Sequence, residues 1–387
     1  MDDQHITHQS NQVEPTTKTK RFESIDTLRG FALLGILVPN IVAFAWPMGA
    51  MTNPDIISDS HANQLAHTIT TTAFLGKFMF LFAMLFGSGV IMYARKFDRA
   101  DEQGKYHTKL SKGAALWFSR CAWLLLFGLM PAYLLWYGDI LTYLGAIFLM
   151  SFSALGYWAL SAGHITTSDL SSDPVIEIIG YSGTYIDAFK TRFFMTLIMQ
   201  VTVGIFFMPI LWGIMSMGMG LTRMGILTGE RPLAFYIKTA IICLGLGIPL
   251  TAFGYIFAHK TFALEPGFMW QSLAQPVGVP LAFGYGALMI ALSKCEPAAI
   301  ICKPLAAVGR MALTNYFLHT ILCTTFFYGY GLGYFASIEY PQLWSVVLIV
   351  WTINITFSMV WLKFFTMGPF EWLWRVLTYR HLVPIRT

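Results

Sequence analysis

A continuous apolar run near the start of the chain constrains the fold more than any other feature. It extends from Ile25 to Trp46, IDTLRGFALLGILVPNIVAFAW. A helix needs roughly 20 apolar residues to cross a bilayer, so this run is long enough. It nevertheless carries Asp26 and Arg29 at its start. Ionisable residues in or beside a span are costly and mark functional positions. The run therefore predicts a membrane helix with polar groups placed at chosen depths.

Similar runs recur along the chain. Only 12% of the 387 residues are charged, about half the share in soluble domains, so the chain lacks the charge to coat a water-facing surface. In lipid each run must be helical because its backbone finds no water to bond. We predict an all-α, polytopic transmembrane helix bundle, with residues 21–387 forming one domain. The runs cover about 25–46, 69–94, 114–137, 139–162, 193–222, 233–258, 268–292, 305–330 and 342–362.

The placement of Lys and Arg predicts the orientation, because cytoplasmic loops are rich in these residues. We expect a multi-pass protein of the plasma (inner) membrane with both termini cytoplasmic, and no nucleic-acid partner. Residues 1–20 are polar and predict a disordered cytoplasmic tail. An odd number of crossings is needed between residues 113 and 161, where two runs are visible. We therefore expect about ten membrane helices, with either three short helices or a half-membrane hairpin in 114–162.

Several polar residues are candidates for binding. Asp26 and Arg29 are three residues apart and can pair, or Arg29 can reach a phosphate or carboxylate near the cytoplasmic interface. Asn40 lies three turns further along, where an amide can join helices or orient a substrate carbonyl. Lys77 can snorkel from the outer end of its helix or place a charge in an outer cavity. Arg120 and Asp139 are expected on opposite sides of the membrane, and Asp139 is also a helix N-cap candidate.

The segment GRMALTNYFLHT contains three further candidates, Arg310, Asn315 and His319, along one expected helix. Asn315 and His319 are four residues apart and share a face. An intramembrane His beside an amide suits proton transfer, and it equally suits a hydrogen-bonded helix contact. The segment MGPFEWLWR predicts a short amphipathic helix at the cytoplasmic surface, with Glu371 in its first turn. We find no sequence support for metal or nucleotide-hydrolysis chemistry.

Five segments together resemble a known family. They are SIDTLRGFALLGILVPN, KFMFLFAMLFGSG, WYGDILTYLGAIF, GRMALTNYFLHT and GPFEWLWR, and they run from Ser24 to Arg375. In this order they are similar to the YeiB-like bacterial membrane proteins, the domain-of-unknown-function 418 family. That family in turn resembles membrane acyltransferases, including the family 3 sugar O-acyltransferases and heparan-alpha-glucosaminide N-acetyltransferase. The shared feature is an LRG start on the first span, here Leu28, Arg29 and Gly30.

The resemblance implies transfer of an acyl group from cytosolic acyl-CoA to a sugar across the membrane, with Arg29 near the donor path. In the O-acyltransferase branch a His usually stands eleven residues after that Arg, where this chain has Asn40. The heparan-type branch has Asn there and its acting His in the first outer region. The nearest such candidates here are His61 and His67.

We therefore expect an acyltransferase-like fold, with Arg29 binding the donor, Asn40 orienting the acyl carbonyl, and His319 or an outer His acting as the base. Acyl-CoA would be a co-substrate, with no covalently bound cofactor and no metal. The expected partners are the lipid bilayer and a carbohydrate or envelope acceptor, and a homodimer stays open. Two other functions also stay open: a small-solute transporter with Arg29, Lys77, Asp139 and Arg310 along its path, and a non-catalytic scaffold.

Overall fold

The protein is a bundle of helices in the computed structural model, which describes residues 23–51, 53–98, 106–137, 174–261 and 275–386. In these ranges the regular structure is helical, apart from an isolated β-bridge between Phe365 and Arg386. The elements are α1 Glu23–Ala45, η2 Met48–Met51, η3 Pro54–Ile56, α2 His61–Ile69, η4 Thr70–Phe74, α3 Lys77–Asp98, α4 Tyr106–Leu134, α7 Pro174–Ser182, α8 Tyr185–Arg223, α9 Leu233–Thr261, η6 Gln275–Gly278, α11 Val279–Ser293, η7 Glu296–Ala298, α12 Ala299–Arg310, α13 Ala312–Phe327, α14 Tyr340–Phe364 and α15 Pro369–Tyr379.

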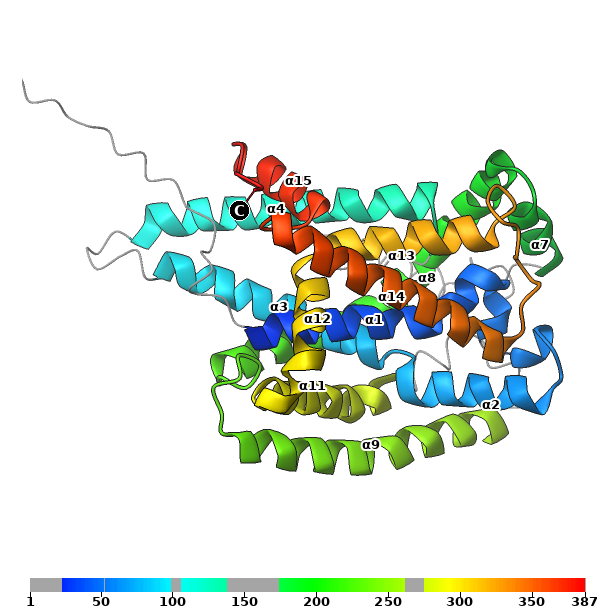
Figure 1. Cartoon of the computed structure of the whole chain (residues 1–387), viewed down its shortest axis with the longest axis horizontal. Helices are drawn as coiled ribbons and strands as arrows, with labels where there is room; N and C mark the ends of the chain where they lie inside the picture. Colours follow the sequence, from blue (N-terminus) through cyan, green and yellow to red (C-terminus); the bar gives the residue numbers. More distant parts are fainter. Residues whose placement is uncertain (1–22, 52, 99–105, 138–173, 262–274, 387) are drawn as a thin grey trace, which may run out of the picture.

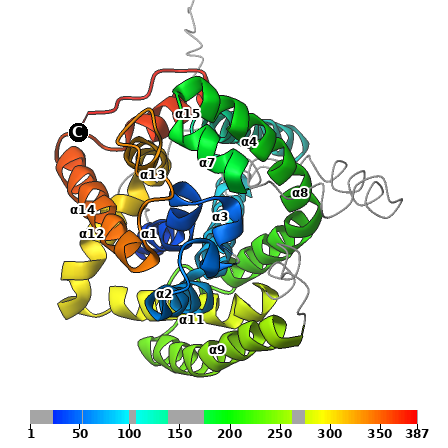
Figure 2. The same cartoon turned by 90° about the vertical axis from the view of Figure 1, so that its right-hand side faces the viewer.

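Helix α1 is the centre of the bundle (Figures 1 and 2). Other helices surround it on all sides when the bundle is viewed along its length. In its most apolar stretch of 18 residues, 83% of the residues are buried. This is expected for a helix that is apolar around its whole circumference. Distant segments bond to it: the Trp351 indole donates to the carbonyl of Leu34, and the Trp46 indole donates to the carbonyl of Ile338. The first apolar run is therefore buried in protein, and other helices face the lipid.

Five helical segments in the described ranges are long and apolar enough to cross a membrane, and a bent pair brings the number to six. They are Glu23–Ala45, His61–Arg95, Ala115–Leu134, Leu233–Gly254 and Tyr340–Phe364, with the bent pair Val279–Ser293 plus Glu296–Arg310. In the most apolar stretch of α9 only 17% of the residues are buried, and large apolar side chains such as Leu246 and Phe253 are exposed. The chain is therefore a polytopic helical membrane protein. The segment expected to contain an additional helix or hairpin lies partly outside the described residues.

Pairs of glycines set the closest helix crossings. Gly30 of α1 faces Gly309 of α12, and a Cβ on either would collide with the backbone of the other helix, at the carbonyls of Leu305 and Asp26 respectively. Gly87 of α3 and Gly218 of α8 repeat this arrangement, each against a backbone carbonyl of the opposite helix. Without a strong hydrophobic force between helices in lipid, such small residues let the backbones pack closely.

The run 305–330, which the sequence predicted as one helix, is broken. Helix α12 ends at Arg310 and α13 begins at Ala312, with Met311 at φ −115° and ψ 35° between them. Helix α12 is bent by 105° from α11 and crosses the bundle transversely, as Figure 1 shows. The expectation that Arg310 and His319 lie along one helix was therefore wrong. The carboxylate of Glu371 meets the first amides of α13 and so satisfies the new helix start.

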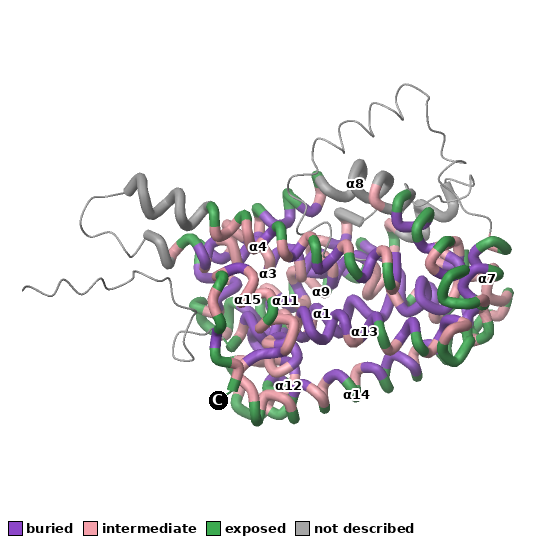
Figure 3. Tube along the Cα trace, turned by 90° about the horizontal axis from the view of Figure 1, so that it is seen from above, coloured by how far each residue is buried: buried purple, intermediate pink, exposed green. Residues whose placement is uncertain are grey.

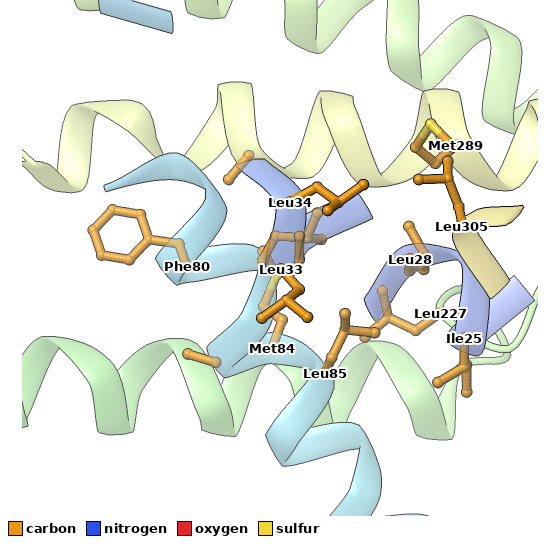
Figure 4. Close-up of a cluster of buried hydrophobic side chains, with 14 of the residues drawn as sticks. Ile25, Leu28, Leu33, Leu34, Phe80, Met84, Leu85, Leu227, Met289 and Leu305 are labelled. Carbon is orange, nitrogen blue, oxygen red and sulfur yellow. The ribbon is translucent and has the colours of Figure 1, made fainter. Parts of the chain in front are cut away.

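Two apolar clusters fill the interior; Figure 4 shows part of the first, and Figure 3 shows how far each residue along the chain is buried. The first joins Leu28, Leu33 and Leu34 of α1 to α3, α11 and α12, through residues such as Phe80, Met289 and Leu305. The second surrounds the other half of α1, from Leu37 to Ala45. Buried residues follow α1 along its length, as the tube coloured by burial shows. We call the end of the bundle that carries α15 the C-terminal end, and the opposite end, which carries α7, the α7 end.

Candidate functional site

Arg29 and Asp26 form the ion pair that their spacing predicted. Arg29 Nη1 lies 3.5 Å from Asp26 Oδ1, near the start of α1 at the C-terminal end. The Asp26 side chain is 7% exposed and that of Arg29 is 29% exposed. The carboxylate therefore holds one edge of a guanidinium that still reaches solvent. A partly exposed, oriented arginine can bind a phosphate or carboxylate bidentately.

Asn40 lies on the same face of α1 as Arg29. Eleven residues are about three turns, which separates their Cα atoms by about 16 Å along the helix axis. Asn40 is half-buried, and its amide makes no hydrogen bond within the described ranges. Pro39 beside it has no backbone N–H and so cannot bond to the carbonyl four residues earlier. The second half of α1 therefore carries a side-chain amide that can bond to a ligand, and next to it a backbone carbonyl, that of Gly35, which Pro39 leaves without its helical partner.

His319 is buried at the depth of the middle of α1. Helix α13 lies alongside α1 in Figure 1. Its early residues Leu313 to Phe317 join the first apolar cluster, and Cys323 and Phe327 join the second. His319 stands between these groups, is 5% exposed, and its Nε2 has no hydrogen-bond partner in the described structure.

The neighbouring amide is committed to helix packing. Asn315 Nδ2 donates to the Ser358 hydroxyl of α14 at 2.7 Å and to the carbonyl of Val308 in α12 at 3.2 Å. Of the two alternatives considered for this pair, the hydrogen-bonded helix contact applies to Asn315. His319, on the same face, remains available for proton transfer.

Lys77 is a buried cation at a break in the second span. It is 5% exposed, and its Nζ donates to the carbonyl of Thr71 at 2.8 Å. The carbonyl belongs to η4, a π-helical turn, and Gly76 at φ 81° precedes α3. Glycine tolerates this left-handed conformation. Single π-helical turns inside helices are frequent at functional sites. Snorkelling was one reading of Lys77, but its ammonium is instead held inside the protein.

The two outer histidines differ in their surroundings. His67 is 1% exposed, its Nε2 is 3.0 Å from the carbonyl of Met51, and its ring meets the edge of Tyr340. His61 begins α2 after the Ser60 cap and is exposed. His67 thus fixes the 51–67 segment, while His61 is open to solvent.

Two other arginines bind parts of the C-terminal segment. The Arg120 guanidinium lies 4.3 Å from the centre of the Trp374 ring and 5.4 Å from that of Tyr93. Arg310 Nη2 donates to the carbonyl of Thr366 at 3.1 Å. Both side chains therefore tie helices to the segment around α15 instead of joining Asn40 and His319. Asp139 lies outside the described residues.

Glu371 has a larger role than its sequence position predicted. Its Oε1 accepts hydrogen bonds from the amides of Leu313 and Thr314, and its Oε2 accepts one from the Thr314 hydroxyl. Burial raises the pKa of Glu371, and these hydrogen bonds oppose the rise. A carboxylate at a helix N-terminus is favoured by the helix dipole. The contact between Glu371 and α13 joins residues far apart in the chain, so no local pattern indicated it.

A second polar group at the α7 end was also missed. Arg192, buried in α8, lies there with several tyrosines whose hydroxyls are buried. Each of these residues is unremarkable in the sequence, because aromatic residues are expected at membrane interfaces. The folded chain brings them together from separate helices.

The fold and these polar positions define an integral membrane protein with a buried first helix and ionisable groups at several depths. Residues 221–381 match the family described as protein of unknown function (DUF418). This match and the similarity to YeiB-like proteins confirm the resemblance noted in the sequence.

Relatives match over nearly their whole length. The uncharacterized protein YeiB of Escherichia coli (strain K12) is 29% identical, over 94% of this chain and 98% of its own. The uncharacterized protein YxaH of Bacillus subtilis (strain 168) is also 29% identical, over 96% of this chain and 98% of its own. No solved structure gives a significant match.

Proposed function

We propose that this protein is an acyltransferase of the plasma (inner) membrane that moves an acyl group from cytosolic acyl-CoA to a hydroxyl or amine of an extracytoplasmic sugar or envelope acceptor. The observation that carries the proposal is the unpartnered Nε2 of buried His319, at the depth of the middle of α1. Arg29 and Asn40 share one face of that same helix. The resemblance of the LRG start supports the class of reaction, and the bacterial relatives support the plasma (inner) membrane.

The orientation in this proposal follows the basic residues. The C-terminal end carries Arg29, Arg310 and Arg380 and would face the cytoplasm, whereas the α7 end would face outward. The full chain would cross the membrane about ten times in an acyltransferase-like arrangement. Arg29 would then meet the donor on the cytoplasmic side.

The chemistry assigns one task to each residue. The Arg29 guanidinium binds a phosphate of acyl-CoA, and the flexible pantetheine arm carries the thioester along α1 towards Asn40. The Asn40 amide donates a hydrogen bond to the thioester oxygen, where charge develops in the transition state. His319 Nε2 takes the proton from the acceptor hydroxyl as its oxygen attacks the carbonyl carbon. The carbon–sulfur bond then breaks, and the CoA thiolate recovers a proton.

The test uses the full chain in proteoliposomes with radiolabelled acetyl-CoA and an envelope extract as acceptor. We expect label to enter the acceptor fraction, and His319→Gln to lower kcat by about 10²-fold or more, as for loss of a general base. Arg29→Gln should mainly raise the KM for acetyl-CoA. Lys363→Gln removes an exposed cation elsewhere and should leave both constants unchanged.

Two outcomes would refute the proposal: wild-type protein that transfers no label and binds no acetyl-CoA, or His319→Gln protein that is as active as wild type. His67→Gln serves as the alternative-base variant. If it removes activity while His319→Gln does not, the outer His is the base and the assignment to His319 is wrong.

A small-solute carrier is the second candidate, favoured by the break at Lys77. Discontinuous helices whose ends face a cavity are typical of substrate sites in transporters. In this reading the Lys77 ammonium and the π-helical turn hold an anionic solute. Proteoliposomes without acetyl-CoA should then accumulate solute, and Lys77→Met should stop the flux. A scaffold without chemistry predicts instead that Arg29→Ala and Asn40→Ala change only abundance or assembly.

A further inference from the structure

The α7 end contains polar atoms that have no partner in the described structure. They are Arg192 Nη2 and the hydroxyl oxygens of Tyr137, Tyr181, Tyr328 and Tyr330. Arg192, Tyr181 and Tyr328 are each 0% exposed, and Tyr137 is 3% exposed. Buried polar atoms are nearly always hydrogen-bonded, to protein, to water or to a bound group. Five such atoms on five residues at one end of the bundle therefore call for a common explanation.

These residues are in contact with one another. The ring centres of Tyr181 and Tyr328 are 4.6 Å apart, those of Tyr328 and Tyr330 are 5.8 Å apart, and those of Tyr137 and Tyr181 are 6.4 Å apart. They come from the residues after α4, from α7, and from the end of α13 and the residues that follow it. The cluster therefore forms only when separate parts of the chain fold together.

Arg192 is held firmly but incompletely. Its Nε donates to the carbonyl of Tyr133 at 3.0 Å, and its Nη1 donates to the carbonyl of Leu135 at 2.9 Å. These carbonyls lie at the end of α4, where helical partners run out. Its Cζ lies 5.5 Å from the Tyr185 ring centre. No carboxylate of the described residues forms an ion pair with it. Since buried charges are normally paired, the site lacks a negative partner.

The nearby hydroxyls act as donors. Burial raises the pKa of Tyr181 and Tyr328 well above its ordinary value, and Arg192 only partly opposes the rise. They therefore keep their protons. Burial also raises the pKa of Tyr330, and polar contacts of its hydroxyl with Thr324 and Arg192 oppose the rise.

The nearby negative group is Glu177. It raises the pKa of Tyr137, after burial, and its Oε2 accepts a hydrogen bond from the amide of Met48. Its charge also raises the pKa of Tyr181 and Tyr328, and the charge of Arg192 opposes that rise. We call Arg192 with the unpartnered hydroxyls of Tyr181, Tyr328 and Tyr330 the Arg192 side, and each of these groups has a proton to donate.

We propose that the Arg192 side of this cluster is an oxyanion-binding site: one carboxylate or phosphate group accepts hydrogen bonds from Arg192 Nη2 and from the hydroxyls of Tyr181, Tyr328 and Tyr330. A guanidinium with hydroxyl donors matches the oxygens of such a group in charge and geometry. The anion supplies the negative partner that Arg192 lacks. This site lies at the α7 end, away from Arg29, and does not depend on acyl transfer.

The experiment measures the melting temperature of the full-length protein in detergent. Sodium phosphate and sodium acetate are titrated at constant ionic strength against sodium chloride. A ligand that binds only the folded state raises stability in a saturable way. We expect one or both anions to give such a rise with wild-type protein. The double variant Tyr328→Phe/Tyr330→Phe should weaken the apparent Kd about tenfold or more, equivalent to about 1.4 kcal/mol or more. Arg192→Lys should weaken it as well, because a point charge replaces a fixed fork.

The matched control is Tyr236→Phe. Its hydroxyl is also buried, but it donates to the carbonyl of Ile226 at 2.7 Å. This variant should lower the melting temperature and keep the full anion response. The Tyr328→Phe/Tyr330→Phe protein should show the opposite behaviour, because neither hydroxyl makes a hydrogen bond as well formed as that of Tyr236. This contrast separates ligand binding from a structural role even where Arg192 variants fold poorly.

Native mass spectrometry separates the two sources of the anion. A phospholipid retained by wild-type protein and lost in the double variant identifies a lipid headgroup, and its absence together with a phosphate or acetate response identifies a dissolved ligand. If wild-type protein shows neither response nor retained lipid, or if the double variant responds like wild type, water alone satisfies these atoms and the proposal is wrong.

Discussion

The crossing of α3 and α8 gives the sharpest test of the packing. Gly87→Ala adds a methyl group that would collide with the backbone carbonyl of Met215. Gly89→Ala adds the same methyl two residues away on the same helix, where nothing lies within 4 Å. Both variants add one methyl group to the same helix. The two positions differ by about 3 Å along the helix axis, since each residue rises 1.5 Å. Only the space available to the methyl group differs.

The magnitudes follow from that difference. Overpacking a well-packed interior costs about 1–3 kcal/mol, and occasionally more. A backbone carbonyl cannot rotate away as a flexible side chain can, so Gly87→Ala should lie at about 3 kcal/mol, the upper part of that range. Replacing Gly by Ala in a helix interior otherwise stabilises by up to about 1 kcal/mol, which is the expected sign for Gly89→Ala. The two proteins should therefore differ by about 2–4 kcal/mol.

The assay is unfolding of both variants in mixed micelles with increasing sodium dodecyl sulfate, followed by tryptophan fluorescence. The reciprocal pair on α8 repeats the comparison: Gly218 faces the carbonyl of Met84, whereas Gly220 has nothing within 4 Å. Equal stability of Gly87→Ala and Gly89→Ala would refute the close crossing. If Gly87→Ala and Gly218→Ala destabilise, their double variant should cost less than the sum, because both changes separate the same two backbones.

Three further results are expected from the C-terminal segment. The pKa of Glu371 is raised in the folded protein, so its contribution to stability is greatest when the pH is below 4.5, the ordinary pKa of a glutamate. That contribution is lost as the pH rises through the pKa of the folded state. Thermal unfolding of Glu371→Gln between pH 4 and 8 should lack this part of the pH dependence. Thr314→Val removes a hydroxyl that donates to Glu371 and accepts from the amide of Phe370, and should lower stability by about 1–3 kcal/mol in chemical denaturation. Trp374→Leu should weaken attachment of α15 to Arg120 by about 1–2 kcal/mol, measured as faster proteolysis near the C-terminus, while Leu373→Ala on the exposed side should not.

The sequence was informative wherever the physics is local. The length and apolarity of the run at Ile25 predicted a membrane helix, and the three-residue spacing of Asp26 and Arg29 predicted their ion pair. Helix class follows from the bilayer itself, because any span must satisfy its own backbone. These inferences need only neighbouring residues. The order of the five motifs along the chain also predicted the similarity to the DUF418 family.

Non-local contacts were beyond such reasoning. The break at Met311 depends on Glu371, which is separated from it by 60 residues, and on the approach of α12 to α1 at Gly309. A hydropathy run shows neither. The cluster around Arg192 was missed for the same reason, because its tyrosines come from distant segments. Whether Arg29, Asn40 and His319 act on one substrate stays a prediction, since their roles depend on the bound ligand.

The central position of α1 has a consequence for biogenesis. This helix leaves the ribosome well before part of its surroundings: Trp46 bonds to Ile338 and Leu34 bonds to Trp351, at separations of 292 and 317 residues. During synthesis it must therefore wait, in lipid or beside the insertion machinery, with Asp26 and Arg29 still lacking the helices that later enclose them. Truncation before α14 would leave α1 without the bond from Trp351 and without the helix that carries it.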